Sequence, residues 1–391
     1  MIIEIKGVEF DNKGSHLMLV SIIERVTEIW PMARIAISAS ATTPTKKIKS
    51  ISALRKINFR KLWLDLTFLT YLLPSWFCKW MISHRFVTEA SVDMIMDASG
   101  FSYSEQWNSR IRIFHLKNEL VRLSKRGKHY IFLPQAFGPF SNTTSFKSLA
   151  ESLPLASLIC AREKESYNHI LSLTGPIPNL KIYPDFTNVL TGSPSSKWQS
   201  VRAGVCMIPN GNMLRADTPS SKWLGRYLEV VMEAIILYQN LGANVFLLKH
   251  TAFLDDALIG AINSMLIEPL TVVDEPDPYA VKGIIGSCKA VFSSRYHGCV
   301  SALSQGVSCL GTSWSHKYET LFEDYGVEDF LVAPDIDQQS LKTLIQVTLT
   351  PNSSASQRIQ AKSNIHRECT EKMWLDIQDV VDEVTPTAAY K

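Results

Sequence analysis

Short apolar runs that alternate with longer amphipathic stretches are the feature that most restricts the fold of this chain. Residues 2–5 and 33–39 are apolar enough to form buried strands, and residues 17–29 between them carry apolar side chains at helical spacing. The same alternation returns later, where the apolar run 203–208 precedes the amphipathic stretch 223–241. Because parallel strands need a crossover helix between them, the pattern predicts an α/β fold with parallel sheets.

The length of the chain favours two domains. At 391 residues it exceeds what one hydrophobic core usually supports. Residues 191–202 combine Gly, Pro and Ser, which is typical of a linker. We therefore expect a first Rossmann-like domain over residues 1–192 and a second over residues 200–350. Residues 351–391 are expected to form a C-terminal helix that packs back on the first domain.

Polar side chains follow the expected strands of the first domain at the points where these strands end. They are Asn12, Asp97, Gln135, Arg162 and Asp185. Because the carboxyl ends of parallel strands meet at one edge of a sheet, and ligands bind there, we expect these side chains to converge. For Asp97 the structural alternative is an N-cap of the next segment.

The strongest candidate site follows the apolar run 290–292. Two serines end the expected strand, Arg295 and His297 come next, and the residues after them have helical spacing. This places both side chains at a helix N-terminus just past a strand, where free N–H groups and the helix dipole favour anions. Lys317 follows the next apolar run and adds a second cation. The pattern predicts an anion site with a proton donor, and a structural salt bridge at Arg295 is the alternative.

Six stretches resemble the polysaccharide pyruvyl transferase family, and they occur in the order of that family. The most informative is SSRYHG at residues 293–298, followed by a helix end at Gly306 and by Lys317. The other stretches are GVEFDNKG at 7–14, DASGF at 97–101, LPQAFGP at 133–139, AREKES at 161–166 and YPD at 183–185, with His250 followed by Asp255 or Asp256. The resemblance spans about residues 5–330.

The resemblance implies a GT-B-like architecture, with two Rossmann-like domains that face each other across a cleft. The first domain would hold the acceptor and the second the donor. The implied reaction transfers the enolpyruvyl group of phosphoenolpyruvate to a sugar of an exopolysaccharide or capsule, or of its lipid-linked precursor. The product is a pyruvate ketal, and phosphate is released. Phosphoenolpyruvate is a co-substrate in this scheme, and we expect neither a metal nor any other cofactor.

The donor in this reaction carries a phosphate and a carboxylate. Arginine binds such planar anions better than lysine does, so Arg295 is the expected main ligand, with Arg162 and Lys317 assisting. His297 is the expected acid that protonates C3 or donates to the leaving phosphate, because histidine titrates near neutral pH.

The acceptor hydroxyl needs a base. Asp97 is the first candidate, and Asp185 and His250 are its alternatives. Asn12 and Gln135 are expected to contact the acceptor or to have a secondary role in the site.

Two other functions are compatible with the same sequence. One is a GT-B glycosyltransferase that uses a nucleotide sugar, similar to the sialyltransferases. The other is a non-catalytic carbohydrate-binding protein of the polysaccharide assembly machinery.

Composition excludes several classes of protein. A net charge of +3 gives no signature of nucleic-acid binding. The chain has seven cysteines, and none of them forms a Cys-X-X-Cys pair, so we do not expect a metal cluster. The odd number indicates reduced thiols and a location in the cytoplasm. The first ten residues alternate polar and apolar side chains, which predicts a strand and not a signal peptide.

Residues 42–88 depart from the rest of the chain. A basic stretch, 46–61, precedes an apolar stretch rich in Trp, Phe and Leu that is too short to span a bilayer. We expect a helical insert. It either makes a peripheral contact with the inner face of the membrane, through about residues 46–85, or packs as a helical hairpin on the sheet.

Overall fold

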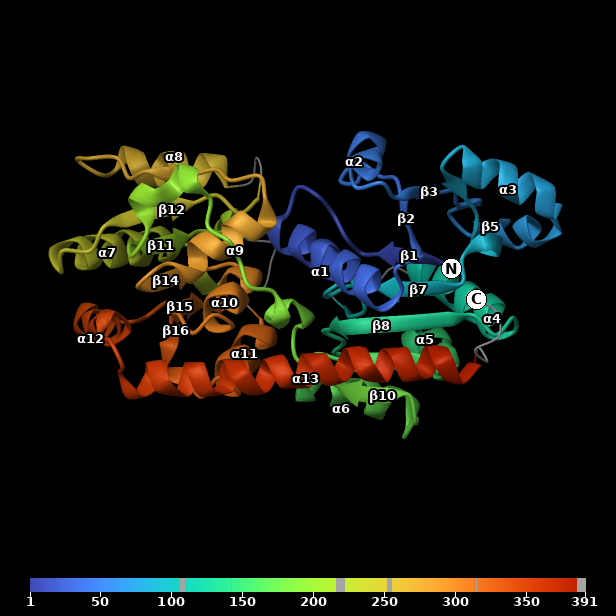
Figure 1. Ribbon diagram of the computed structural model, residues 1–391. Coiled ribbons are helices and arrows are strands. Elements are labelled where there is room, and N and C mark those ends of the chain that lie inside the picture. The colour runs from blue at the N-terminus through green and yellow to red at the C-terminus, as the bar shows by residue number, and fades with distance from the viewer. Residues whose placement is uncertain (106–109, 142, 216–221, 252–254, 314, 385–391) are drawn as a thin grey trace. The chain divides into compact units, whose positions relative to one another are not determined.

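The computed structural model describes residues 1–105, 110–141, 143–215, 222–251, 255–313 and 315–384. Its backbone forms two α/β units (Figure 1). The first unit comprises Met1–Phe10, Met18–Phe186 and Thr370–Lys391, and the second comprises Asp11–Leu17 and Thr187–Cys369. Both ends of the chain therefore belong to the first unit.

The first unit is built on an eight-stranded sheet in which every paired strand is parallel to its neighbours. In order across the sheet the strands are β10 (Leu180–Ile182), β9 (Leu158–Ala161), β8 (His129–Gln135), β7 (Met94–Asp97), β1 (Ile2–Lys6), β2 (Arg34–Ser38), β3 (Leu54–Lys56) and β6 (Phe86–Val87). The helices are α1 (Lys13–Ile29), α2 (Thr45–Ser50), α3 (Ser75–Ser83), α4 (Arg110–Ser124), α5 (Lys147–Ser152) and α6 (Lys164–Thr174).

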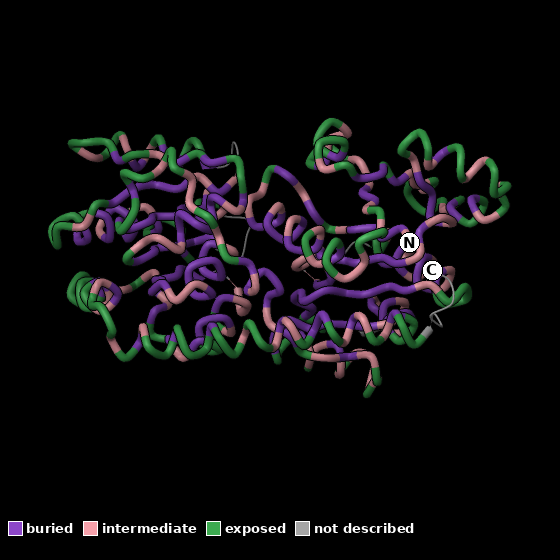
Figure 2. The backbone as a smooth tube through the Cα atoms, viewed as in Figure 1, coloured by how far each residue is buried: buried purple, intermediate pink, exposed green. Residues whose placement is uncertain are grey.

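Both faces of this sheet are buried, because successive side chains of a strand point to opposite faces. In β7, Met94 and Met96 enter one core together with side chains of α1, and Ile95 enters the other together with side chains of α4 and α5. The tube in Figure 2 shows the strands as buried. The continuous apolar runs in the sequence follow from this double coverage.

The second unit has a six-stranded parallel sheet. In order the strands are β13 (Val272–Val273), β12 (Val245–Leu248), β11 (Val205–Ile208), β14 (Ala290–Ser293), β15 (Ser308–Thr312) and β16 (Leu331–Val332). Its helices are α7 (Tyr227–Asn240), α8 (Asp256–Ser264), α9 (Pro278–Gly286), α10 (Tyr296–Leu303), α11 (His316–Asp324), α12 (Gln338–Leu349) and the start of α13 (Ser354–Val384). Its strand order reverses beside β14, which is where ligands bind in open α/β sheets.

The last helix, α13, is shared between the two units. Its residues up to Cys369 belong to the second unit, and those from Thr370 onward belong to the first. Met373, Trp374 and Ile377 are buried in the same core as α1.

Residues 42–88 differ from the expected helical insert. They contain the short helices α2 and α3, a 3₁₀ helix at Thr67–Leu72 and a hairpin of β4 (Arg60–Lys61) and β5 (Leu64–Asp65). They also supply β3 and β6, which extend the main sheet. These two strands are three and two residues long, too short to leave an apolar run in the sequence.

A fully buried ion pair joins two strands of the first unit. Lys56 in β3 contacts the carboxylate of Glu4 in β1, and both side chains are inaccessible to solvent. Removing one partner of such a pair leaves an uncompensated buried charge, whereas replacing both with apolar groups is often tolerated.

We therefore expect Lys56→Met to lower the free energy of unfolding by about 3–5 kcal/mol, and the double variant Glu4→Leu/Lys56→Met to lower it much less. Denaturant titration measures both. The matched control is Lys117→Met, which breaks the exposed pair between Lys117 and Glu151 and should cost less than about 1 kcal/mol. Equal losses in the single and double variants would contradict the expectation.

Candidate functional site

The turn between β14 and α10 is closed by Ser293. Its hydroxyl accepts a hydrogen bond from the N–H of Arg295 at 3.1 Å and donates one to the carbonyl oxygen of Arg295 at 2.9 Å. Gly298 makes room for this serine, because a Cβ at position 298 would overlap the Ser293 hydroxyl. Arg295 is thereby fixed as the N-cap residue of α10.

Ser294 is anchored by four groups from other elements. Its hydroxyl accepts hydrogen bonds from Tyr227 at 2.7 Å and Thr312 at 2.8 Å. Its carbonyl oxygen accepts from the amide of Asn210 and the hydroxyl of Tyr318, both at 3.1 Å. Burial raises the pKa of Tyr227 to about 12, so this phenol keeps its proton and remains a donor. The backbone that presents Arg295 is held on several sides.

Arg295 forms an ion pair with Asp255, and both side chains are buried. Asp255 also accepts backbone hydrogen bonds from Thr251 at 2.8 Å and Gly211 at 3.4 Å. The Nε atom of Arg295 has no hydrogen-bond partner among the described residues. The salt bridge that was the alternative interpretation therefore exists, and it orients a guanidinium that still has an unused donor.

The structure distinguishes the two aspartates that follow His250 in the sequence. Asp255 faces Arg295, whereas Asp256 pairs with Lys249 at 2.7 Å and is largely exposed. The partner of Arg295 is therefore Asp255.

The turn that contains Asn12 lies against the histidines of the second unit. Asn12 forms an isolated β-bridge with Thr251, and the N–H of Lys13 donates to the carbonyl oxygen of His250 at 3.2 Å. A Cβ at Gly14 would overlap the imidazole ring of His297. Position 14 needs glycine because His297 fills the space. Asn12 therefore lies with His250 and His297 in the second unit.

His250 is a neutral imidazole at physiological pH. Burial lowers its pKa well below the ordinary value, and the positive charges of Arg295, His297 and Lys13 lower it further. Its Nδ1 atom has no hydrogen-bond partner among the described residues. The group is thus an uncharged, buried proton acceptor surrounded by cations.

Lys317 lies at the start of α11. Its Nζ atom is 5.4 Å from the ring centre of Tyr296 and 5.7 Å from that of Tyr318. Because Tyr318 also binds Ser294, this cation belongs to the same assembly as Arg295.

In the first unit, Asp97 ends β7 and is buried. Its carboxylate accepts hydrogen bonds from the hydroxyls of Tyr103 and Tyr130, both at 2.7 Å, and from Ser99. Burial and the charge of Asp97 raise the pKa values of both tyrosines well above their usual range. These phenols therefore remain protonated donors to Asp97.

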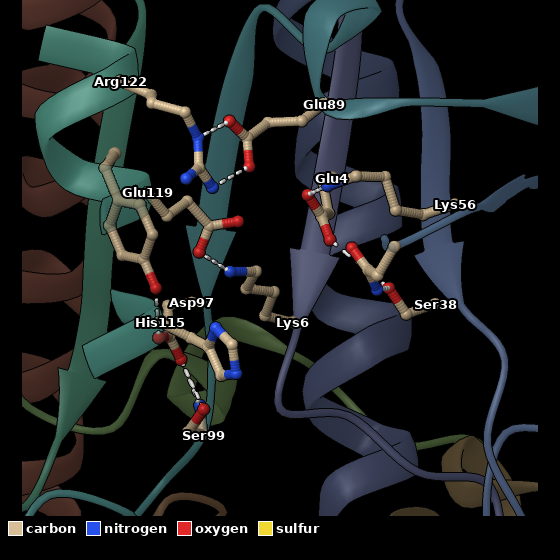
Figure 3. Close-up of polar contacts among 12 residues, drawn as sticks. Glu4, Lys6, Ser38, Lys56, Glu89, Asp97, Ser99, His115, Glu119 and Arg122 are labelled. Carbon is tan, nitrogen blue, oxygen red and sulfur yellow. Dashed lines mark hydrogen bonds and ion pairs between the residues drawn. The ribbon is translucent and has the colours of Figure 1, made fainter. Parts of the chain in front are cut away.

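Asp97 lines a cavity of about 340 Å³ in the first unit. Its charged walls are Lys6, Arg60, Arg112, Glu119 and the titratable His115. Figure 3 shows the ion pair between Lys6 and Glu119 beside Asp97. Burial alone would raise the pKa of Glu119, but Lys6, Arg60 and Lys56 lower it to about 2. The cavity therefore combines the carboxylates of Asp97 and Glu119 with three basic side chains, and it suits a polar ligand.

Three other predicted residues meet at the same edge of the first sheet. Gln135 donates to the carbonyl oxygen of Asp97 at 3.2 Å. Arg162 has its N–H bonded to the carbonyl oxygen of Gln135, and its guanidinium lies 3.8 Å from Asp185 and 3.5 Å from Glu163. The convergence predicted for Asp97, Gln135, Arg162 and Asp185 is present, with the charge of Arg162 offset by two carboxylates.

Among the residues that the structure describes, no group of three or more His, Cys, Asp or Glu side chains is placed to hold a metal ion.

The comparison with protein families decides the relationship of the chain. The polysaccharide pyruvyl transferase family matches residues 12–316. The chain belongs to this family. Membership makes this pyruvyl transferase family protein a transferase that acts in polysaccharide biosynthesis. A search of the curated proteins finds no match.

Solved structures with the same fold include three sugar-related proteins. A UDP-N-acetylglucosamine 2-epimerase from Neisseria meningitidis is 9% identical, with a TM-score of 0.59 and coverage of 97% of this chain and 99% of that one. A putative UDP-N-acetylglucosamine 2-epimerase from Listeria monocytogenes is 10% identical (TM-score 0.58; 98% and 96% covered). Anabaena Alr3699/HepE in complex with UDP is 13% identical (TM-score 0.57; 98% and 99% covered). The predicted GT-B class, with two Rossmann-like units, is confirmed.

Sequence reasoning missed several residues that shape both sites of this pyruvyl transferase family protein. Tyr227, Thr312 and Asn210 come from distant elements and share no local motif with Arg295. Tyr103 and Tyr130 resemble ordinary core aromatics in the sequence. These residues share a buried hydroxyl or amide group, and only the fold brings them to the strand ends at Ser294 and Asp97.

The depressed pKa of His250 predicts a pH-dependent stability. In the folded protein the imidazole stays neutral below the ordinary histidine pKa, whereas in the unfolded chain it binds a proton. The unfolded state therefore takes up more protons, and stability falls as the pH drops below about 6.5. In His250→Gln, the free energy of unfolding should therefore fall less steeply with decreasing pH, by up to about 1.4 kcal/mol per pH unit. Denaturant titrations between about pH 7 and 5 measure it, and an unchanged pH slope would contradict it.

The contact between Gly14 and His297 predicts opposite effects for two glycine replacements. Gly14→Ala should lower the free energy of unfolding by about 1–3 kcal/mol, because the new methyl group displaces the His297 ring. Gly260→Ala is the control, since position 260 lies in α8 with open space around it, and should raise stability by about 0.5–1 kcal/mol. The NMR signals of the His297 ring should move only in the first variant. An unmoved ring in Gly14→Ala would disprove the contact.

Proposed function

We propose that this protein transfers the enolpyruvyl group of phosphoenolpyruvate to a sugar of a polysaccharide or of its precursor. C3 of the donor gains a proton and becomes a methyl group, while a sugar hydroxyl adds to C2 and loses its proton to a base. The bond between C2 and the phosphate oxygen then breaks, a second hydroxyl of the same sugar attacks C2, and its proton leaves with the phosphate. The products are a pyruvate ketal and inorganic phosphate.

The observation that supports this proposal best is the buried guanidinium of Arg295 at the N-terminus of α10, within a chain of this family. Asp255 fixes the side chain from one direction, and the N-terminus of a helix favours a bound anion. A small donor with a phosphate and a carboxylate suits these groups, because charge-assisted bonds to arginine are strong and directional. In the proposal Lys317 adds a second cation.

His297 is the proposed acid for C3, or the donor to the leaving phosphate. It is held against Gly14, and the neutral His250 is among the groups that respond to its charge. Burial is the main reason that the pKa of His250 is low, and in the proposal a bound dianion would offset only the smaller contribution of the nearby positive charges. The neutral His250 is the alternative base in the proposal.

The cavity beside Asp97 is the proposed acceptor site. Asp97 already accepts hydrogen bonds from two phenols and from Ser99. In the proposal a sugar hydroxyl replaces the serine donor and gives its proton to the carboxylate. Gln135 and Asp185 are proposed to support the acceptor from the same edge, and Arg162 is proposed as a second contact to the donor.

The proposed reaction assigns no step to a metal or another cofactor, since charged and titratable side chains supply the proton transfers and the phosphate site. We place it in the cytoplasm, and the free cysteines suit such a reducing compartment.

Arg295→Lys tests the donor site. The variant keeps a positive charge near Asp255 but loses the planar pair of donors, so kcat/KM for phosphate release from phosphoenolpyruvate should fall about 100-fold. Arg202→Lys, at an exposed position of the second unit, is the matched control and should keep full activity. Circular dichroism verifies that both variants are folded.

Calorimetric titration with phosphoenolpyruvate, UDP and CMP completes this test. We expect phosphoenolpyruvate to bind the unaltered protein and to bind Arg295→Lys much more weakly. Binding of a nucleotide without phosphoenolpyruvate would favour a nucleotide-sugar glycosyltransferase. Near-normal turnover in Arg295→Lys would refute the assigned donor site.

A further inference from the structure

The segment of residues 59–80 exposes apolar side chains and buries polar ones. Almost half of the exposed large hydrophobic side chains among the described residues lie in this stretch. Leu72 is 77% exposed and Trp76 is 69% exposed, whereas Thr67 and Thr70 in the same stretch are buried. Burial of apolar surface is the main driving force of folding, so this inverted arrangement indicates a surface that is covered by an apolar partner.

A buried polar network fixes the underside of this segment. Arg122 of α4 binds Asp65 at 2.8 Å and holds Glu89 through two bonds, and Tyr71 donates to Glu89 at 3.0 Å. Burial opposes ionisation of Asp65, but hydrogen bonds from Thr67 and Arg122 lower its pKa to about 2. Figure 3 shows the double contact between Arg122 and Glu89. The network holds the apolar side chains outward in a defined surface.

Two of the exposed tryptophans lie on α3. Trp76 and Trp80 are four residues apart and so lie on the same face of this helix. Phe77 stacks on Trp80 with ring centres 5.5 Å apart and meets Trp76 edge-on at 5.7 Å. Met81 of the same helix is buried. Figure 2 shows exposed turns in α3. We use the name aromatic face for five of the exposed apolar side chains of this segment, which are Leu62, Trp63, Leu72, Trp76 and Trp80.

The exposed charged residues in and next to this segment of the chain have one sign. Lys61, Lys79 and Arg85 are all exposed. Asp65 is the only acidic residue between Glu28 and Glu89, and its charge is neutralised by Arg122. Protein interfaces are depleted in lysine, whereas tryptophan flanked by lysine and arginine is typical of segments that lie in the headgroup region of a bilayer.

We propose that the aromatic face docks on the surface of a membrane that contains anionic lipids. The tryptophan and leucine side chains enter the boundary between headgroups and acyl chains, and the flanking cations meet lipid phosphates. Across the described residues, no helix is long and apolar enough to cross a bilayer. This inference rests on the surface alone and is independent of the proposed reaction.

Vesicle flotation tests the proposal with the full chain. We expect the protein to float with phosphatidylglycerol–phosphatidylcholine vesicles, to float poorly with pure phosphatidylcholine, and to be released by high salt. Trp76→Ser/Trp80→Ser and Lys61→Glu/Lys79→Glu should each lower the partition coefficient at least about tenfold. Met32→Ser and Ile267→Ser are matched controls, because both side chains are highly exposed outside the aromatic face, and they should bind like the unaltered protein.

Three results would overturn the proposal. They are failure of the protein to float with anionic vesicles, equal flotation of the double tryptophan variant, and self-association in solution that this variant abolishes without any binding to vesicles. The last result would assign the aromatic face to a second copy of the chain. Phosphate release is measured separately without lipid. This assay tests the proposed reaction alone, so its result does not depend on whether the protein binds vesicles.

Discussion

The buried contact between Arg295 and Asp255 is the interaction on which the candidate donor site depends. A guanidinium can stay in a low-dielectric environment only if its charge is compensated and its donors are directed. Asp255 supplies the charge, backbone amides hold Asp255, and the hydrogen bonds to Ser294 hold the backbone of the arginine. The cation is therefore positioned before any ligand arrives, which lowers the entropic cost of binding an anion.

The sequence predicted the long, buried strands of the sheets better than it predicted the short strands and the turns next to them. The strands that precede Asp97, Arg162 and Arg295 lie where the apolar runs indicated, because strands covered on both faces must be apolar throughout. The strands β3 and β6 were missed, since they are only three and two residues long and leave hardly any pattern in the sequence. The place of Asn12 was also missed, because a turn can leave one sheet and join the other unit without a change in composition.

The two candidate sites use their polar residues differently. In the second unit a net positive assembly surrounds a neutral histidine, and the cations outnumber Asp255. In the first unit several buried charges lie next to a charge of opposite sign, as in the contacts of Lys6 with Glu119 and of Arg162 with Asp185. An anionic ligand gains most from the positively charged environment in the second unit, and a neutral sugar gains most from the environment in the first unit. The net charge of the whole chain does not show this local difference, because it arises from the way the topology groups the side chains.

The division of α13 between the units has a consequence for the order of events during synthesis. A ribosome releases the strands of the first unit early, yet Met373, Trp374 and Ile377 complete its core only when almost all of the chain has emerged. Until then the groove that receives them is open to water and to other nascent chains. Most of the second unit is the continuous segment Thr187–Cys369, so it can fold before the first unit is complete.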